Sequence, residues 1–448
     1  MSRTRSTGGQ SVTCGLTRRD FLRDTAAAGA ALTLGAAAAG GRAAAQQTAS
    51  APAAGGGRAN GRLGVGFIGV GGRGRAHLEY VHWLQTDGKE PVEIAAVCDV
   101  YRPRLRAAAD GYKVRPYDDY RELLADKGVD VVCVATPDHL HAPQAIAALA
   151  AGKHVYCEKP VTHWRQFDLT KQLAEAAAKS KAVFQLGTQA MSDGAWRQMK
   201  KLVGEGAIGK PLFGETGFFR TGDWGERGMP VDDPQAKAGK DLNWEAFLGD
   251  APPREFSVDR FFRWRLFEDY AGGPATDLYP HCLTQVIDIL GLKFPRTVVA
   301  TGGVHRYDYE LREVPDTFNM LAEYPEKVTV SVVGTQANDF QGTGARGSGA
   351  RIPVIRGWDG ALTIVGKEIV LYPNNDAKKP PQRFAIEQDE DMIGHWRNFL
   401  ECCRRGDKGT NSPMELAYHV QTALIMASWS LRQGKVARFD AVEQRIAM

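Results

Sequence analysis

The sequence predicts an α/β protein of two domains, in which a parallel-sheet domain is followed by an α+β domain with a large, mostly antiparallel, open-faced sheet. Over residues 62–187, short apolar segments alternate with helical ones, which is typical of repeated strand–helix–strand units. From residue 188, strands of alternating polarity are combined with amphipathic helices. The length of 448 residues also exceeds the roughly 250–300 residues of a single core.

Residues 1–45 combine basic, apolar and small residues in a fixed order. The pair Arg18-Arg19 precedes a weakly apolar, alanine- and glycine-rich segment at 25–40, and Ala43-Ala44-Ala45 offers a small-residue cleavage site. This order is typical of a twin-arginine signal peptide, so we expect a periplasmic or otherwise exported protein; the alternative is a disordered basic tail. Residues 46–61 are expected to form a flexible linker.

The charge of the chain lies in this leader. Residues 1–45 hold six arginines and two aspartates, which equals the formal net charge of +4 of the whole chain. The remainder has equal numbers of basic and acidic residues, so its charge does not indicate binding to nucleic acid or to an anionic membrane.

No apolar run has the roughly 18 residues of a membrane span. The seven cysteines lack metal-binding spacing, so we expect no metal and free, buried thiols.

A glycine motif follows the first apolar strand. The strand at 63–68 runs into Gly69-x-Gly71-x-x-Gly74, and a helix begins there. In this context the glycines allow a tight turn, the approach of a pyrophosphate and close packing of the helix on the strand. The pattern predicts a Rossmann domain over 62–187 that binds a nicotinamide dinucleotide; the alternative is a glycine-rich turn in another α/β protein. The expected contacts of this loop are Gly69, Gly71, Gly72, Arg73 and Gly74.

An acidic residue closes the next strand. Asp99 follows the apolar run at 92–98, where a carboxylate accepts hydrogen bonds from the adenosine ribose and repels a 2′-phosphate. NAD is therefore favoured over NADP. Arg102 and Arg104 come shortly after and suit a phosphate, which leaves NADP open. Because an exported protein has no exchange with the cellular cofactor pool, we expect the dinucleotide to be held tightly.

Two further strand ends carry polar residues. The strand at 129–135 is followed by Thr136, Pro137 and His139, and the strand at 154–157 is followed by Glu158 and Lys159. The carboxyl ends of parallel strands meet at the ligand crevice, so these five residues are expected beside the cofactor. A cationic group at this position steadies the oxygen of a reacting hydroxyl, which makes Lys159 a catalytic candidate.

In the second half, Asp277 and His281 are four residues apart in a segment that leads into an apolar helix at 282–290. On a helical turn they share one face and can touch. A carboxylate on one ring nitrogen would fix the tautomer and make His281 a base, with Asp277 as its support. A helix cap and a structural histidine are the alternative.

Substrate contacts are expected from loops that combine hydrogen-bonding groups with aromatic faces, although solvated loops explain them as well. The candidates are Arg220, Asp223, Trp224, Arg263 and Trp264.

In the second domain, strands are expected at 212–219, 298–302, 317–324, 327–334 and 361–365. Residues 341–349 are too glycine-rich to pack, so we expect a loop there. The helices at 392–404 and 413–431 are expected to cover one face of the sheet.

Taken together, these motifs resemble the Gfo/Idh/MocA family, named for glucose–fructose oxidoreductase and inositol dehydrogenase. The resemblance covers residues 62–440 and is carried by the glycine loop, Glu158-Lys159-Pro160 and the Asp277-x-x-x-His281 element. It implies an NAD(P)-dependent dehydrogenase of sugars or cyclitols, with Lys159 and His281 beside the reacting carbon. It also implies that the domain at 188–440 binds substrate and forms the interface of a homodimer or homotetramer.

The expected function is therefore an exported oxidoreductase that transfers a hydride between tightly held NAD and a secondary hydroxyl of a sugar, sugar derivative or cyclitol. Tyr279-Pro280 resembles the family's glycosidase branch, so an NAD-dependent glycosidase is the alternative. A non-catalytic sugar-binding protein is the third interpretation.

Overall fold

The computed structural model describes residues 61–223, 229–341, 349–374, 379–386 and 392–448. The predicted signal peptide and linker lie outside these residues, apart from Gly61, and so does Trp224.

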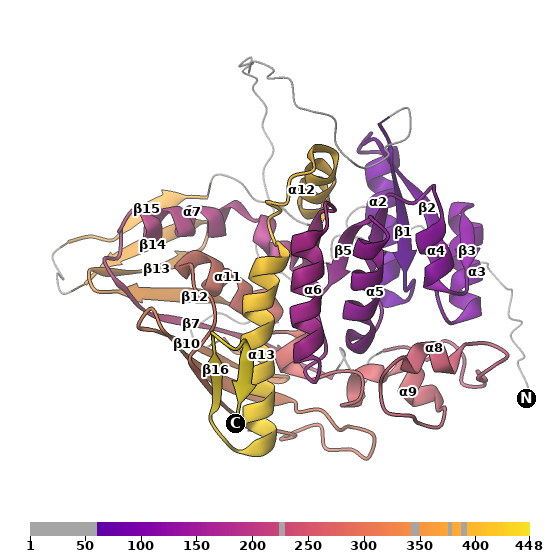
Figure 1. The fold of residues 1–448 in the computed structure, drawn as a ribbon. Coiled ribbons are helices and arrows are strands. Elements are labelled where there is room, and N and C mark those ends of the chain that lie inside the picture. Colours follow the sequence, from indigo (N-terminus) through magenta and orange to yellow (C-terminus); the bar gives the residue numbers. More distant parts are fainter. Residues whose placement is uncertain (1–60, 224–228, 342–348, 375–378, 387–391) are drawn as a thin grey trace, which may run out of the picture.

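The first domain is a parallel sheet with the strand order β3-β2-β1-β4-β5-β6 and helices on both faces (Figure 1). This is the order of the Rossmann fold. Strands β1, β4 and β5 are buried on both faces, which explains their continuous apolar runs. Its elements are β1 (Leu63–Ile68), α2 (Gly72–Thr86), β2 (Val92–Cys98), α3 (Arg102–Tyr112), β3 (Arg115–Tyr117), α4 (Tyr120–Ala125), β4 (Val131–Val134), α5 (Asp138–Ala150), β5 (His154–Glu158), α6 (Phe167–Lys179) and β6 (Phe184–Gly187).

The second domain is built on a sheet of 11 strands with the order β15-β14-β13-β12-β7-β10-β9-β8-β16-β17, and β11 pairs with β7. Only the pair β7–β10 is parallel among the described strands of this sheet, so the expected mostly antiparallel sheet is confirmed. Its strands are β7 (Pro211–Thr221), β8 (Thr297–Gly303), β9 (Thr317–Tyr324), β10 (Val328–Thr335), β11 (Ala337–Asn338), β12 (Gly349–Gly357), β13 (Gly360–Val365), β14 (Glu368–Pro373), β15 (Gln382–Ala385), β16 (Ala437–Asp440) and β17 (Arg445–Ala447).

Helices cover one face of this sheet and leave the other face open (Figure 1). Helix α11 packs on β7 and β12, α13 packs on β8, and α7 packs on α11. Apart from α12, the remaining helical elements are short. The helices of this half are η2 (Gln189–Ser192), α7 (Gly194–Gly204), α8 (Trp244–Leu248), α9 (Val258–Phe262), η3 (Trp264–Leu266), α10 (Pro274–Asp277), α11 (Pro280–Leu290), α12 (Met392–Arg405) and α13 (Met414–Gln433).

Two expectations about this half are corrected. Helix α12 packs on α2 of the first domain, where Trp396 and Phe399 join the core around Tyr156, and so it does not cover the large sheet. Its apolar stripe predicted burial but carried no information about which core it enters. The predicted loop at 341–349 lies mostly outside the described residues, and its last residue, Gly349, is the first residue of β12.

Residues 229–262 cross from the second domain to the first, and we call them the crossing segment. In Figure 1 its helices α8 and α9 lie beside the Rossmann half of the molecule. The backbone N–H of Asn243 donates to Val100 O, and that of Arg102 donates to Asp241 O. The segment therefore closes over the corner that follows β2.

The six cysteines of the described residues are free and buried, as expected. Within the same residues, no helix is long and apolar enough to cross a membrane.

Candidate functional site

A cavity of about 950 Å³ runs along the carboxyl ends of the Rossmann strands. Its size is within the range of small-molecule sites, and its position is the switch-point crevice of open α/β sheets. The first domain contributes the glycine loop, Asp99 and Lys159, and the second contributes Trp264 and the crossing segment. The cavity therefore lies between the two domains.

The glycine loop has the geometry that a dinucleotide needs. Gly69 has a φ of +86°, and a Cβ on Gly74 would lie 1.9 Å from the carbonyl oxygen of Gly69. Among the described residues no side chain caps the start of α2, and its first turn holds no acid. Unpaired N–H groups therefore face the cavity at the positive end of a helix dipole, where a pyrophosphate is stabilised. The residues fit the cofactor, and the individual contacts of Gly71 and Gly72 stay predictions.

Arg73 and Glu158, both predicted as cofactor contacts, bind each other. Arg73 Nε donates to Glu158 Oε1 at 2.9 Å, and His77 Nε2 donates to the same oxygen at 2.7 Å. Trp396 Nε1 donates to His77 Nδ1 at 3.0 Å, which fixes the neutral tautomer of His77. Burial alone would raise the pKa of Glu158, but the charge of Arg73 and the bond from His77 hold it well below its usual value. The pair thus braces β5 against α2 at the cavity wall.

Asp99 is held rigidly at the end of β2. Its two carboxylate oxygens accept backbone N–H bonds from Val70 and Tyr101, each at 2.8 Å. Burial raises its pKa, and these two bonds oppose the rise. Each oxygen keeps a second lone pair, so ribose hydroxyls can still be accepted. The position agrees with the predicted role.

The residues after β4 divide into two groups. Thr136 and Pro137 line the cavity, and the Thr136 hydroxyl donates to Gln144 Oε1 at 2.7 Å. His139 does not line it. Its Nε2 bonds Phe247 O at 2.8 Å, and its ring packs on Phe247 and Tyr270, so its place is in the core between the domains. Burial lowers the pKa of His139 to about 4, which keeps the ring neutral. The expected cofactor contact of His139 is therefore not made from this position.

Lys159, on the cavity wall, binds the buried Asp277 directly. Lys159 Nζ donates to Asp277 Oδ1 at 2.8 Å and to its carbonyl oxygen at 2.7 Å. Arg265 Nε donates to the same carboxylate oxygen at 3.1 Å. Burial would raise the pKa of Asp277, but the charges of Lys159 and Arg265 hold it far below its usual value. A carboxylate and two cations therefore form one buried ionic group.

The predicted contact between Asp277 and His281 is wrong. Asp277 ends α10 and His281 lies in α11, so the two residues are not on one continuous helix. Pro280 starts the second helix, and the Asp277 carboxylate turns to Lys159 instead. The His281 ring is half-buried, is not among the residues that line the cavity, and has no hydrogen bond to any residue that the structure describes. Burial, with the charge of Lys159, lowers its pKa to about 3, so the ring is neutral near pH 7.

The substrate candidates are mostly engaged elsewhere. Trp264 lines the cavity, with the Arg265 guanidinium 4.3 Å from its ring centroid. Arg263 lies off the wall and pairs with Asp259 at 2.7 Å. Asp223 accepts from Arg312 at 2.5 Å and from the Tyr309 hydroxyl, so its carboxylate is committed to a buried structural pair.

Arg220 completes the set of candidates that the structure describes. It is buried and does not line the cavity, although its charge acts on Asp277. The four described candidates thus yield one wall residue, Trp264.

Sequence reasoning missed Asp138 as a residue of the site, and it chose Arg263 where Arg265 is the arginine that faces the cavity. Asp138 is buried at the start of α5, lines the cavity and accepts the Thr276 hydroxyl at 3.2 Å. Burial raises its pKa to about 7, although the charge of Arg265 opposes the rise. An acid at a helix start is read from sequence as a cap, and the order Arg263-Trp264-Arg265 does not say which arginine faces inward.

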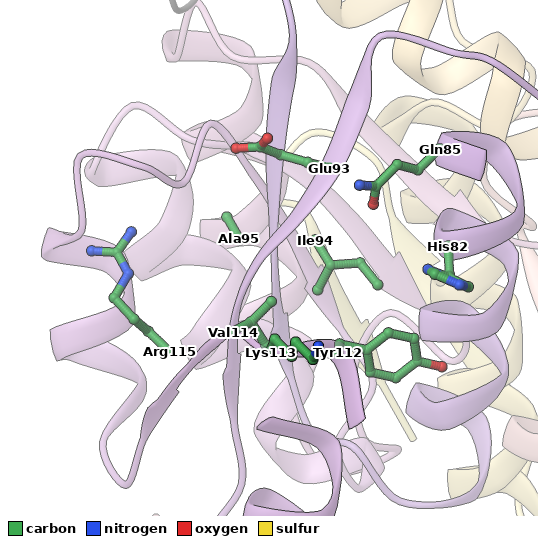
Figure 2. A pocket seen from close by; sticks show the side chains of 9 residues that line it. All are labelled: His82, Gln85, Glu93, Ile94, Ala95, Tyr112, Lys113, Val114 and Arg115. Carbon is green, nitrogen blue, oxygen red and sulfur yellow. The ribbon is translucent and has the colours of Figure 1, made fainter. Parts of the chain in front are cut away.

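A second hollow of about 310 Å³ lies beside the beginning of β2 (Figure 2). His82 and Gln85 of α2 and Glu93 of β2 line it, on the side away from the carboxyl ends of the strands. Its place in the sheet is not that of a switch-point site.

Fold and site together define a two-domain protein of the dinucleotide-binding Rossmann class, in which the second domain places a carboxylate and an arginine on the lysine that follows β5. Residues 63–188 match the model of an oxidoreductase family with an NAD-binding Rossmann fold, and residues 196–348 match the GFO/IDH/MocA C-terminal domain. These two stretches span more than half of the chain. The protein belongs to the Gfo/Idh/MocA family.

Curated relatives include inositol 2-dehydrogenase of Salmonella paratyphi B, which is 34% identical over 152 residues, or 34% of this chain and 44% of that protein. Levoglucosan dehydrogenase of Pseudarthrobacter phenanthrenivorans is 36% identical over 155 residues, or 34% of this chain and 39% of that protein. The chain thus matches less than half the length of these relatives.

Among solved structures, levoglucosan dehydrogenase in complex with NADH and levoglucosan has a TM-score of 0.63 at 19% identity, covering 84% of this chain and 99% of that one. An oxidoreductase domain protein from Kribbella flavida has a TM-score of 0.64 at 22% identity, with 84% and 99% coverage. These likenesses concern the fold.

Proposed function

We propose that the protein is an NAD-dependent oxidoreductase that acts on a secondary hydroxyl of a sugar, sugar derivative or cyclitol. The observation that carries this proposal is the Lys159 ammonium on the cavity wall, fixed at 2.8 Å by the Asp277 carboxylate. A fixed cation in a buried site stabilises negative charge that develops on a substrate oxygen. The named activities of the curated relatives, inositol and levoglucosan dehydrogenation, support the substrate class.

The residues of the site have separate roles in this reaction. Lys159 donates a hydrogen bond to the substrate oxygen, and Asp277 with Arg265 keeps the ammonium in place. The proton acceptor is assigned to His281, whose ring is neutral and makes no hydrogen bond within the described part of the chain, so that a free ring nitrogen can take the hydroxyl proton. NAD, when bound, supplies the hydride acceptor. The glycine loop and Asp99 orient it, and the crossing segment excludes water from the cavity.

We also propose that the protein works outside the cytoplasm with a retained cofactor. The support is the paired-arginine leader at 1–45, because a folded protein exported by this route carries its cofactor along. A retained cofactor must be re-oxidised in place, so a second, carbonyl-containing substrate is required. Initial-rate kinetics with paired substrates are then expected to be of the ping-pong type.

The decisive experiment is to purify the exported protein, release its bound nucleotide for mass spectrometry, and follow reduced-nicotinamide absorbance as sugars and cyclitols are added. Co-purified NAD that is reduced by free sugars supports the proposal. A protein that binds no dinucleotide would overturn it and leave the sugar-binding interpretation.

The glycosidase alternative rested on Tyr279-Pro280. Tyr279 is fully buried in the core of the second domain, and its hydroxyl donates to the carbonyl oxygen of Phe318. A residue in that position does not reach a glycoside in the cavity. We therefore propose oxidation of a free hydroxyl as the single activity.

A homodimer or homotetramer is the proposed assembly. Apolar side chains stand on the uncovered face of the large sheet, among them Val299 and Leu321, which pair across β8 and β9. Both are more than two-fifths exposed, at 41% and 45%. An apolar patch of this kind marks an interaction surface.

A further inference from the structure

We propose that Asp232 of the crossing segment is a specificity-determining residue for the dinucleotide: by holding Arg104 in an ion pair over the glycine loop, it favours NAD over NADP and helps to retain the cofactor. This inference rests on the proposed function, because it concerns the same cofactor cavity. Four sets of contacts carry it.

The crossing segment is tied to the corner after β2 by its backbone. Tyr101 and Leu242 form an antiparallel bridge, and Asn243 N donates to Val100 O at 3.0 Å. The Arg102 side chain donates to two carbonyl oxygens of the segment, Gly239 O at 2.9 Å and Lys240 O at 2.5 Å. Arg102, a candidate for phosphate binding from its sequence position, is therefore used to anchor the segment.

Aromatic packing joins the same two parts. The Tyr101 ring is buried, 5.2 Å from the ring of Phe262 and 5.6 Å from that of Phe261. The Arg104 guanidinium lies over Phe262, 5.2 Å from its centroid, and over Tyr101 at 5.7 Å. Arg104 thus rests in a fixed place on an aromatic support, part of which comes from the second domain.

This place is directly above the dinucleotide loop. A Cβ built on Gly71 would lie 2.8 Å from Arg104 Nη1, so the guanidinium borders the space that the glycine keeps open. Arg104 Nε donates to Asp232 Oδ2 at 2.5 Å, and its charge also acts on Asp99. Arg104, Asp99 and Asp232 all line the cavity.

The charges at this corner decide which dinucleotide fits. An arginine that follows the acid of β2 is the usual partner of a 2′-phosphate. Here Arg104 is flanked by two carboxylates, Asp99 from its own domain and Asp232 from the crossing segment. A 2′-phosphate would bring further negative charge to a group of three side chains, Arg104, Asp99 and Asp232, that already holds two carboxylates for one cation, so the pairing acts against NADP.

The same contacts hold the crossing segment at the wall of the cavity. Met229, Pro230 and Asp232 line the cavity together with the glycine loop. The Arg104–Asp232 pair joins this part of the segment to the first domain. The ion pair therefore also slows cofactor release.

The test is the affinity of the purified, full-length Asp232→Asn protein for NAD⁺ and NADP⁺, measured by calorimetry after removal of bound nucleotide. We expect the ratio of the two dissociation constants to shift toward NADP⁺ by about tenfold, because Arg104 becomes free to bind the 2′-phosphate. The double variant Asp232→Asn/Arg104→Ala should lose that gain. Dilution of the NAD-loaded protein should release nucleotide faster in Asp232→Asn than in the wild type.

Asp288→Asn is the matched control, because Asp288 forms a partly exposed pair with Lys200 at 2.7 Å on the second domain, away from the cavity. An unchanged affinity ratio in a folded Asp232→Asn protein would overturn the inference. A wild-type protein that binds neither dinucleotide would instead overturn the proposed function, so the two failures are distinguishable.

Discussion

Lys159 and Arg265 share one carboxylate, that of Asp277, and this sharing shapes the chemistry of the site. The side chains of Lys159 and Asp277 are 11% and 12% exposed, so water screens their charges poorly. Removing the one anion leaves two cations facing each other in a buried place. The site therefore depends on Asp277 for its geometry and for its stability.

Asp277→Asn should lower kcat by about 10²–10⁴-fold, the usual scale for loss of a positioned acid–base or charge partner, because Lys159 loses its anchor. The free energy of unfolding should fall by roughly 3–5 kcal/mol, since a buried ion pair is broken from one side. Kinetics and chemical denaturation measure both. Asp259→Asn removes an aspartate that pairs with Arg263 off the cavity wall, and it should change neither quantity much. Full activity in Asp277→Asn would contradict the assigned role.

Asp138 provides the pH dependence of the site. Its pKa in the folded protein is raised by burial to about 7, above its ordinary value of 3.8, so the folded state holds a proton that the unfolded state loses. The carboxyl group thus lowers stability progressively as pH rises from its unfolded to its folded pKa, and the penalty is complete above the folded pKa.

Asp138→Asn keeps an oxygen that accepts the Thr276 hydroxyl and removes the titration. Its Tm relative to the wild type should therefore be higher at pH 8 than at pH 4. The pH profile of kcat/KM should also lose an ionisation near neutrality. An equal Tm difference at the two pH values would show that Asp138 does not titrate between them.

The sequence predicted the residues whose role depends on position along a strand. Lys159 and Asp99 are found where their strand ends place them, because the carboxyl edge of a parallel sheet is determined by topology. Asp138 was missed, and Arg263 was chosen over Arg265, because the roles of these residues depend on side-chain direction. The three-residue turn η3, and not the sequence spacing, turns Arg265 to Asp277 and Arg263 to Asp259.

At the scale of elements, the start of α2 packs very closely on the end of β1. Gly69 and Gly74 pack so closely that a side chain on Gly74 would overlap the backbone of Gly69. Gly72, in the same helical turn, has nothing within 4 Å of its Cβ position. Substitutions at these two glycines therefore distinguish the effect of a steric overlap, at Gly74, from the effect of helix propensity, at Gly72.

Gly74→Ala should force α2 away from β1, lower the free energy of unfolding by about 1–3 kcal/mol and weaken NAD binding. Gly72→Ala is the matched change: it keeps the N–H group and should be neutral or stabilising by up to about 1 kcal/mol. Denaturation curves and NAD titration of the two variants distinguish these outcomes. Equal losses in both variants would mean that the contact with Gly69 is not the cause.

The break between α10 and α11 explains why the predicted contact between Asp277 and His281 does not form. Four-residue spacing predicts a shared face only within a continuous helix, and here the helix restarts at Pro280. An ionic attraction from another domain, that of Lys159, then decides where the Asp277 carboxylate points. Local sequence does not contain that information.

At the scale of the whole molecule, the two domains are joined by more than one chain passage. Helix α12 enters the core of the first domain from the C-terminal part of the chain, and the crossing segment covers the first domain at the β2 corner. The sequence predicted two cores and their order, because apolar periodicity is local. It did not predict which core takes α12, since any apolar groove of the right size satisfies an amphipathic helix.

The open face of the large sheet is where we expect the subunits to associate. Its exposed residues Val299 and Leu321 lie side by side on β8 and β9, and Tyr372 stands exposed on β14. Leu321→Glu would place a charge in the centre of the proposed interface, where desolvation without a partner is unfavourable. Light scattering should then show a smaller species with an unchanged fold by circular dichroism. Val442→Glu, at a residue that is 89% exposed in the turn between β16 and β17, should leave the assembly intact. If wild type and Leu321→Glu have the same mass, the subunits do not associate through this face.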